Sequence, residues 1–289
     1  MSDVIQATYV NARGNQIAWG ADGAHILTSI DGLGGLDAIV STNLAPGQDG
    51  ETWLGSRLPV RTITLTGAVI GRGATLGERR RELMRACNAR GGMGTLAITA
   101  YGRVKCIPAI VLSGPVIIES SDLGWQTYTL SFECPMPYFL DASDTILDMQ
   151  TRVGGLKFLL GLPTQFSRIK RAYRYLARNE GDGECPLTFE FAGGAVAPTL
   201  TNLTTGEYIK VNHTVPDNKT LIISTELGKK RAYLRDNATG AEESAMRYLD
   251  LKSVFFGLEP GDNYLSYGAD DDAAAAMVRV RWRTRYAGF

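Results

Sequence analysis

The sequence contains few residues of the kinds that most catalytic and metal sites need. Among 289 residues there are only two histidines, His25 and His213, and four cysteines. A multi-histidine metal site is therefore excluded, and histidine acid–base chemistry has little room. The cysteines form no Cys-x-x-Cys pair, which favours free thiols in a reducing compartment. We expect no catalytic residues, no metal and no cofactor, and hence no enzyme.

The chain also lacks net charge and long apolar runs. Its 30 Lys+Arg residues balance 30 Asp+Glu residues, so nothing attracts it as a whole to nucleic acid or to an acidic membrane surface. No run approaches the ~18 apolar residues that span a bilayer. Residues 1–15 lack the apolar stretch of a secretory signal. We expect neither nucleic acid nor a membrane as a partner.

Glycine is abundant, with 33 residues, or about 11%, against a usual ~7%. Many turns favour short strands over long helices. The run Arg61-Thr-Ile-Thr-Leu-Thr-Gly67 alternates strictly, which predicts a strand with Ile63 and Leu65 on its buried face. Residues 125–133 alternate in the same way. The N-terminal half therefore predicts strands around one helix.

That helix is predicted to begin at a capping box formed by Thr75 and Glu78 and to end at Gly91-Gly92. Its apolar stripe is expected to contain Leu76, Leu83, Met84 and Cys87.

The C-terminal half has a regular rhythm of short strands and turns, which predicts an antiparallel β-sandwich. The expected strands are residues 186–191, 199–203, 208–211, 220–225, 231–234, 253–256, 264–267 and 277–286. We expect three regions: an N-terminal β domain at 1–145, a linker with edge strands at 146–178, and the sandwich at 179–289.

Basic residues gather in two places despite the zero net charge. Arg79, Arg80 and Arg81 share the predicted helix with Glu78 and Glu82, whose carboxylates weaken any attraction to nucleic acid. On the predicted terminal strand, alternation places a second group on one face: Arg279, Arg281, Arg283 and Arg285. Solvent-exposed surface and a protein partner are the alternatives for both groups. We take them as candidate protein-interaction residues, because separated charges suit complementary patches.

Residues 44–51 form a polar turn cluster, and Asp49-Gly50 is a strong hairpin signal. We interpret residues 44–59 as an extended arm that embraces a neighbouring molecule.

Several segments, in order along the chain, resemble the distal tail protein family (Dit-like, siphovirus-type tail components) of long-tailed bacteriophages. In the first half these are Arg61-Thr-Ile-Thr-Leu-Thr-Gly67, Glu78-Arg-Arg-Arg-Glu-Leu-Met84 and Asn88-Ala-Arg-Gly-Gly-Met-Gly-Thr-Leu96. In the second half they are Gly154-Gly-Leu-Lys-Phe158, Asn179-Glu-Gly-Asp182, Pro186-Leu-Thr-Phe189, Asn202-Leu-Thr-Thr-Gly206 and Leu258-Glu-Pro-Gly-Asp-Asn263.

The resemblance implies a mainly β fold, with an N-terminal split-barrel domain carrying one helix and a C-terminal galectin-like sandwich. It implies a hexameric ring of N-terminal domains at the distal end of the phage tail, assembled in the host cytoplasm. The implied partners are further copies of the chain, the tail tube protein, a tail-tip hub protein and a receptor-binding protein. A carbohydrate-binding sandwich used in host adsorption is the alternative function, although a galectin-like topology does not itself imply sugar binding.

Overall fold

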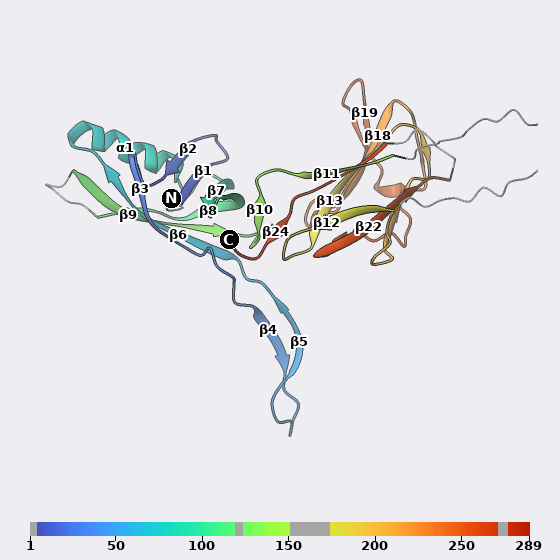
Figure 1. Ribbon diagram of the computed structural model, residues 1–289, viewed down its shortest axis with the longest axis horizontal. Helices are drawn as coiled ribbons and strands as arrows, with labels where there is room; N and C mark the ends of the chain where they lie inside the picture. Colours follow the sequence, from blue (N-terminus) through green and yellow to red (C-terminus); the bar gives the residue numbers. More distant parts are fainter. Residues whose placement is uncertain (1–4, 119–123, 151–173, 271–276) are drawn as a thin grey trace, which may run out of the picture. The chain divides into compact units, whose positions relative to one another are not determined.

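The computed structural model describes residues 5–118, 124–150, 174–270 and 277–289. The chain forms two compact units (Figure 1). Unit 1 comprises Met1–Ala142 and Arg285–Phe289, and unit 2 comprises Ser143–Thr284. The expected division assigned the last residues to the C-terminal domain, but the chain returns to unit 1 at Arg285. Of the expected linker, residues 151–173, including the Gly154–Phe158 segment, lie outside the described part.

Unit 1 is built on one curved antiparallel sheet with the strand order β2-β1-β7-β8-β9-β6-β3. The long strand β8 pairs with β7 along its first half and with β9 along its second. A bridge between Gly20 and Ile26 brings the ends of β2 and β3 together, so the sheet nearly closes as a split barrel. The strands are β1 (Gln6–Val10), β2 (Gln16–Trp19), β3 (His25–Asp31), β6 (Arg61–Ile70), β7 (Gly94–Ala100), β8 (Arg103–Ile117) and β9 (Trp125–Cys134). In addition, β10 (Phe139–Asp141) pairs with β8, and β24 (Arg285–Tyr286) pairs with β10.

The core of unit 1 follows the predicted alternation. Ile63 and Leu65 of β6 are fully buried, which confirms the face assigned to them. They pack with Leu83 and Cys87 from the helix α1 (Gly73–Ala86) and its end.

The helix is present, but both of its predicted ends are wrong. It begins at Gly73 rather than at Thr75, its N-cap is Arg72, and no side chain caps it. Thr75 therefore lies inside the first turn, where its hydroxyl cannot act as the N-cap acceptor. The helix ends at Ala86, before the two predicted glycines. Gly94, at the start of β7, is a position that requires glycine. A Cβ there would lie 2.4 Å from the carbonyl oxygen of Val10.

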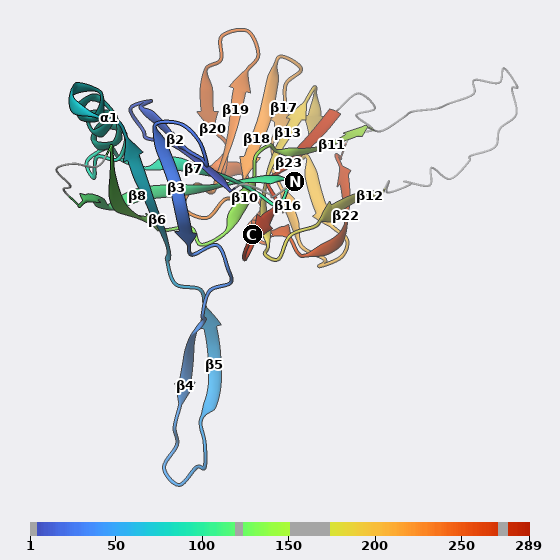
Figure 2. The same ribbon diagram turned by 60° about the vertical axis from the view of Figure 1, so that its left-hand side comes forward.

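A hairpin of two strands, β4 (Ile39–Asn43) and β5 (Thr52–Arg57), extends away from the rest of unit 1 (Figures 1 and 2). The two strands form a sheet of their own. Gly47 and Gly50 adopt positive φ angles of 77° and 76° in the connecting loop. The polar turn cluster thus does form a hairpin end, and we call residues 39–57 the arm.

Unit 2 is an antiparallel β-sandwich, as predicted. One large sheet has the order β11-β23-β13-β18-β19-β20, with β21 beside β13, and a smaller sheet has the order β12-β22-β15-β16. The large sheet contains β11 (Thr145–Gln150), β13 (Cys185–Ala192), β18 (Lys219–Ser224), β19 (Arg231–Asp236), β20 (Glu242–Ser244), β21 (Gly257–Leu258) and β23 (Met277–Trp282). The smaller sheet contains β12 (Tyr175–Asn179), β15 (Thr199–Asn202), β16 (Tyr208–Lys210) and β22 (Gly261–Gly268). The pair β14 (Ala195–Val196) and β17 (Thr214–Val215) and the 3-10 turn η1 (Met246–Tyr248) complete the unit.

Three fully or nearly fully buried asparagines lock the turns of this sandwich: Asn179, Asn202 and Asn263. Asn179 donates to the carbonyl oxygens of Gly183 and Leu258, both at 2.9 Å. Asn263 donates to the carbonyl of Glu259 at 2.7 Å and accepts from its N–H. The Asn-containing segments of the sequence resemblance are therefore turn structures.

Two predicted strands of this half differ in the structure. Residues 253–256 form no strand, although Phe256 is buried. The predicted strand 277–286 is divided into β23 in unit 2 and β24 in unit 1. The break follows Trp282, where the pairing of β23 with β11 and β13 ends.

Candidate assembly surfaces

The arm carries large apolar side chains that nothing in the described chain covers. Trp53 and Leu54 of β5 are each 65% exposed, and Val40 of β4 is 56% exposed. A two-stranded hairpin is only marginally stable alone in water. Contiguous exposed apolar side chains on such an element mark an interaction site. The arm therefore has the character of a segment that is completed by another molecule.

We call residues 32–34, which precede the arm, its root. Arg61, a completely buried residue at the start of β6, holds this root. Its guanidinium donates to the carbonyl oxygens of Gly32 and Gly34, each at 2.6 Å, and to that of Pro137 at 2.8 Å. A further hydrogen bond goes to the carbonyl of Ala287. Burial lowers the pKa of Arg61 from its ordinary value, but a guanidinium remains charged at neutral pH.

Sequence reasoning missed Arg61, although a signal was present. Arg61 has the same parity as Ile63 and Leu65, so the alternation places it on the buried face. A buried cation needs partners that satisfy its donors. The alternation thus indicated that Arg61 is buried, but the carbonyl groups that accept its hydrogen bonds could not be identified from the sequence.

The predicted basic helix face is only partly available to a partner. Arg79 donates to the carbonyl oxygen of Ile70 at 2.6 Å, which ties it to the end of β6. Arg80 is half-buried, whereas Arg81 is exposed beside the exposed Glu78. The outward face of α1 therefore mixes both charge signs.

Of the predicted basic strip, Arg279 and Arg281 lie on β23 in the large sheet of unit 2, and Arg283 follows the end of that strand. Each of these three arginines forms an ion pair with a carboxylate on a neighbouring segment. Arg279 pairs with Asp148, Arg281 with Glu190, and Arg283 with Asp144. The strip is thus neutralised within unit 2.

Arg285 differs from these three arginines, because it belongs to unit 1. It lies opposite Leu140 of β10, and its guanidinium carbon is 5.8 Å from the ring centroid of Tyr138.

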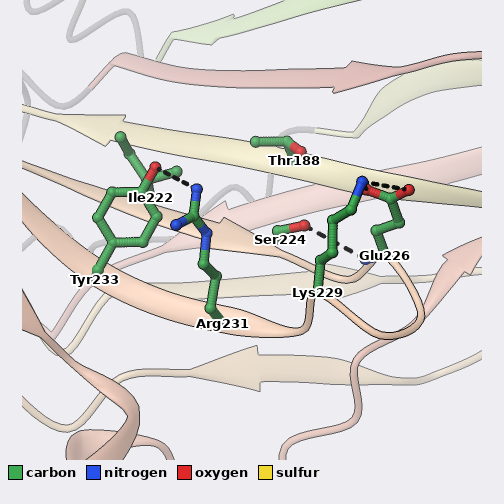
Figure 3. A pocket seen from close by; sticks show the side chains of 7 residues that line it. All are labelled: Thr188, Ile222, Ser224, Glu226, Lys229, Arg231 and Tyr233. Atoms are coloured by element: carbon green, nitrogen blue, oxygen red, sulfur yellow. Dashed lines mark hydrogen bonds and ion pairs between the residues drawn. The ribbon is translucent and has the colours of Figure 1, made fainter. Parts of the chain in front are cut away.

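A shallow pocket of about 500 Å³ opens on the large sheet of unit 2 (Figure 3). Its lining is Thr188, Ile222, Ser224, Glu226, Lys229, Arg231 and Tyr233. The Arg231 guanidinium carbon lies 4.4 Å from the ring centroid of Tyr233, and Lys229 pairs with Glu226 at 3.3 Å. The pocket offers hydroxyl groups, both charge signs and one aromatic ring.

Two of the four cysteines and one of the two histidines lie in packed surroundings. Burial raises the pKa of the Cys87 and Cys134 thiols to about 12, so both stay protonated. His213 stacks on Tyr248, with ring centroids 4.0 Å apart. Within the described residues, no group of three or more His, Cys, Asp or Glu side chains is placed to hold a metal ion. None of the described helices is long and apolar enough to cross a membrane.

Comparison with known proteins supports the resemblance seen in the sequence. Residues 180–286 match the family model described as the siphovirus-type tail component, C-terminal domain. The resemblance to distal tail proteins is confirmed. No curated protein matches the chain.

Solved structures extend the resemblance in fold to nearly the whole chain. The crystal structure of the Dit (gp 19.1) protein of phage SPP1 matches with a TM-score of 0.69 and 15% identity, over 96% of this chain and 98% of that one. It is described as a paradigm of the hub adsorption apparatus in phages that infect Gram-positive bacteria.

The phage P2 baseplate, activated with Ca, matches with a TM-score of 0.53 and 10% identity, over 98% of both chains. The form with Sr gives 0.52 and 10%, over 96% and 97%. The expected mainly β fold is thus confirmed.

Proposed function

We propose that this chain is a structural hub of a phage tail tip or baseplate. Six copies form a ring that joins the tail tube to the tail-tip and receptor-binding apparatus, and the protein resides at the distal end of the virion tail after assembly in the host cytoplasm. Support comes from the family match of the second half and from the shared fold with a hub protein and baseplate chains.

The observation that carries the proposal is the uncovered arm of unit 1. Its exposed Trp53, Leu54 and Val40 need a partner, and a ring supplies one next to every subunit. In this arrangement unit 1 is the ring-forming domain, and the arm of each copy embraces the next copy. The exposed Arg81 on α1 is proposed as a contact to a tube or tip protein.

Oligomeric state tests the proposal. Native mass spectrometry and light scattering of the purified chain, alone and with the tail tube protein, are expected to show a hexamer. The double substitution Trp53→Ser with Leu54→Ser is expected to leave a folded monomer. Leu227→Ser is a matched control, because Leu227 is 84% exposed but lies in unit 2. A wild-type chain that stays monomeric under both conditions contradicts the proposal, as does a hexamer that survives the double substitution.

A second function, carbohydrate binding by unit 2, is favoured by one observation. The lining of the pocket in Figure 3 includes the Tyr233 ring and the hydroxyls of Thr188 and Ser224, which are groups that sugars use for stacking and hydrogen bonding. A glycan array with the full chain tests this function. Binding that Tyr233→Ala abolishes supports it, and an array without signal removes it.

A further inference from the structure

The return segment, residues 285–289, packs against unit 1, and we call the set of unit 1 residues that it contacts the groove. Tyr286 pairs with Phe139 across the β24–β10 ladder, and Arg285 pairs with Leu140. The N–H of Phe289 donates to the carbonyl oxygen of Leu33 at 2.9 Å. The segment thus joins the edge of β10 to the root of the arm.

Two buried cations recognise successive carbonyl groups of this segment. Arg61 donates to the carbonyl of Ala287, and the Lys105 ammonium donates to that of Gly288 at 3.0 Å. The same ammonium lies 3.9 Å from the ring centroid of Tyr286 and 5.1 Å from that of Phe289. These contacts fix both the register and the aromatic character of the segment.

Phe289 occupies an aromatic site at the end of the groove. Its ring packs edge-on against Phe139, with centroids 5.6 Å apart, and lies 6.4 Å from the ring of Tyr101. A Cβ at Gly288 would lie 3.4 Å from the carbonyl oxygen of Leu33, at ordinary contact distance, so the chain there runs alongside residues 33–35. The side-chain recognition of the segment therefore rests on its two aromatic residues, Tyr286 and Phe289.

The same groove residues also hold residues 32–34, which precede the arm. The guanidinium that binds Ala287 also binds Gly32 and Gly34, just before the first strand of the arm. Leu33, between those glycines, accepts the N–H of Phe289. The arm has a separate two-stranded sheet, so it joins the rest of unit 1 through the residues that flank it.

We propose that the return segment is a latch that holds the arm in the pose used for assembly, and that its groove is a binding site for an extended Arg-Tyr-Ala-Gly-Phe peptide. The assembly consequence rests on the proposed function of the arm, whereas peptide binding and arm restraint do not.

Hydrogen exchange measures arm restraint without requiring a ring. The measurements use the Trp53→Ser, Leu54→Ser chain, so that no neighbouring copy protects the arm. Deletion of residues 285–289 in this chain is expected to speed exchange in residues 31–57 roughly tenfold or more, because Leu33 loses its contact with Phe289 and the unrestrained segment opens more often. Phe289→Ala and Lys105→Met are expected to give a smaller increase confined to the same residues. These two variants provide the test if the deletion variant does not fold.

Asn11→Ala is the matched control for general loss of stability in unit 1. Its amide donates to the carbonyl of Ala86 at 3.1 Å and is buried, but it lies outside the groove. It is expected to leave exchange in residues 31–57 unchanged. Equal acceleration by Asn11→Ala and Phe289→Ala overturns the latch, and so does unchanged exchange in both Phe289→Ala and Lys105→Met.

Peptide binding tests the groove directly. A fluorescent peptide with the sequence of residues 283–289 is expected to bind the deletion variant but not the chain with an intact return segment. Replacing Phe289 by Ala in the peptide is expected to weaken binding roughly tenfold or more. A folded deletion variant that does not bind the peptide overturns the groove. If the wild-type chain forms no ring while these results hold, the proposed function fails and the latch stands.

Discussion

Arg279 on β23 donates two hydrogen bonds to Asp148 on β11, with Nε–Oδ1 2.7 Å and Nη2–Oδ2 3.0 Å. The two residues face each other across the strand pair. Their contact changes the interpretation of the charge pattern. The acidic start of unit 2 and its basic last strand are separate in sequence but meet on one face of one sheet, so they neutralise each other.

The Asp148 carboxylate should report this pairing directly. Hydrogen bonding from Arg279 lowers the pKa of Asp148 below its ordinary value. The pair therefore stabilises unit 2 above about pH 4, and this stability is lost as pH falls through the lowered pKa. Arg279→Met is expected to raise the pKa of Asp148 in an NMR titration, whereas Arg247→Met leaves it unchanged. An unchanged Asp148 pKa in Arg279→Met contradicts the pairing. Both side chains are over a third exposed, so the effect on stability is small.

The surroundings of His25 predict that the stability of unit 1 depends on pH. Its Nε2 lies 3.4 Å from Glu82, but burial outweighs this contact and lowers the pKa of His25. Protonation thus favours the unfolded state, so stability is expected to fall as pH drops below about 6.5. His25→Gln should flatten the denaturation free energy of unit 1 between pH 7.5 and 5, and His213→Gln should not. Identical pH profiles for wild type and His25→Gln would count against this account.

The register of α1 is tested by two adjacent substitutions. Leu83 is fully buried and Met84 is 41% exposed, although the sequence placed both in the apolar stripe. Leu83→Ala is expected to lower the free energy of unfolding by about 2–4 kcal/mol through a lost side chain and a cavity. Met84→Ala should change it by less than about 1 kcal/mol. Comparable losses in denaturant titrations of the two variants would show that the helix packs in another register.

The buried turn asparagines should be costly to remove. Asn263→Ala leaves the carbonyls of Glu259 and Gly261 without their donor, so a loss of about 1–3 kcal/mol is expected. Asn218→Ala is the control, because its contact with Asp236 is exposed and 3.4 Å long. The melting temperature of unit 2 is measured for both variants by thermal unfolding. A melting temperature equally insensitive to the two substitutions would rule out the turn-locking role.

Strands with strict alternation could be predicted because their burial repeats every second residue. Ile63 and Leu65 alternate with threonines, and both are buried as expected. Residues 253–256 do not show this strict alternation. Val254 makes one ladder-like bond to Tyr208, and the N–H of Phe256 bonds only to Val254, so the apolar run forms no strand.

The ends of elements were harder to predict, because competing local signals have similar energies. Thr75 and Glu78 have capping-box spacing, yet the helix begins at Gly73. Packing of Leu83 against the sheet dominates, since an N-cap contributes only ~1 kcal/mol. The candidate surfaces differed in the same way. The hairpin of the arm could be predicted from its turn, but the pairing of the arginines with carboxylates could not.

Local pattern was sufficient for the fold class and for the hairpin end of the arm, because these depend on residues that are neighbours in the sequence. Only the folded chain decided which charges are neutralised and where the last strand lies. Arg279 and Asp148 are 131 positions apart, and Arg61 and Ala287 are 226 apart. Such partners carry no mutual signal in composition or periodicity, since each acquires its meaning only when the sheets bring the two together.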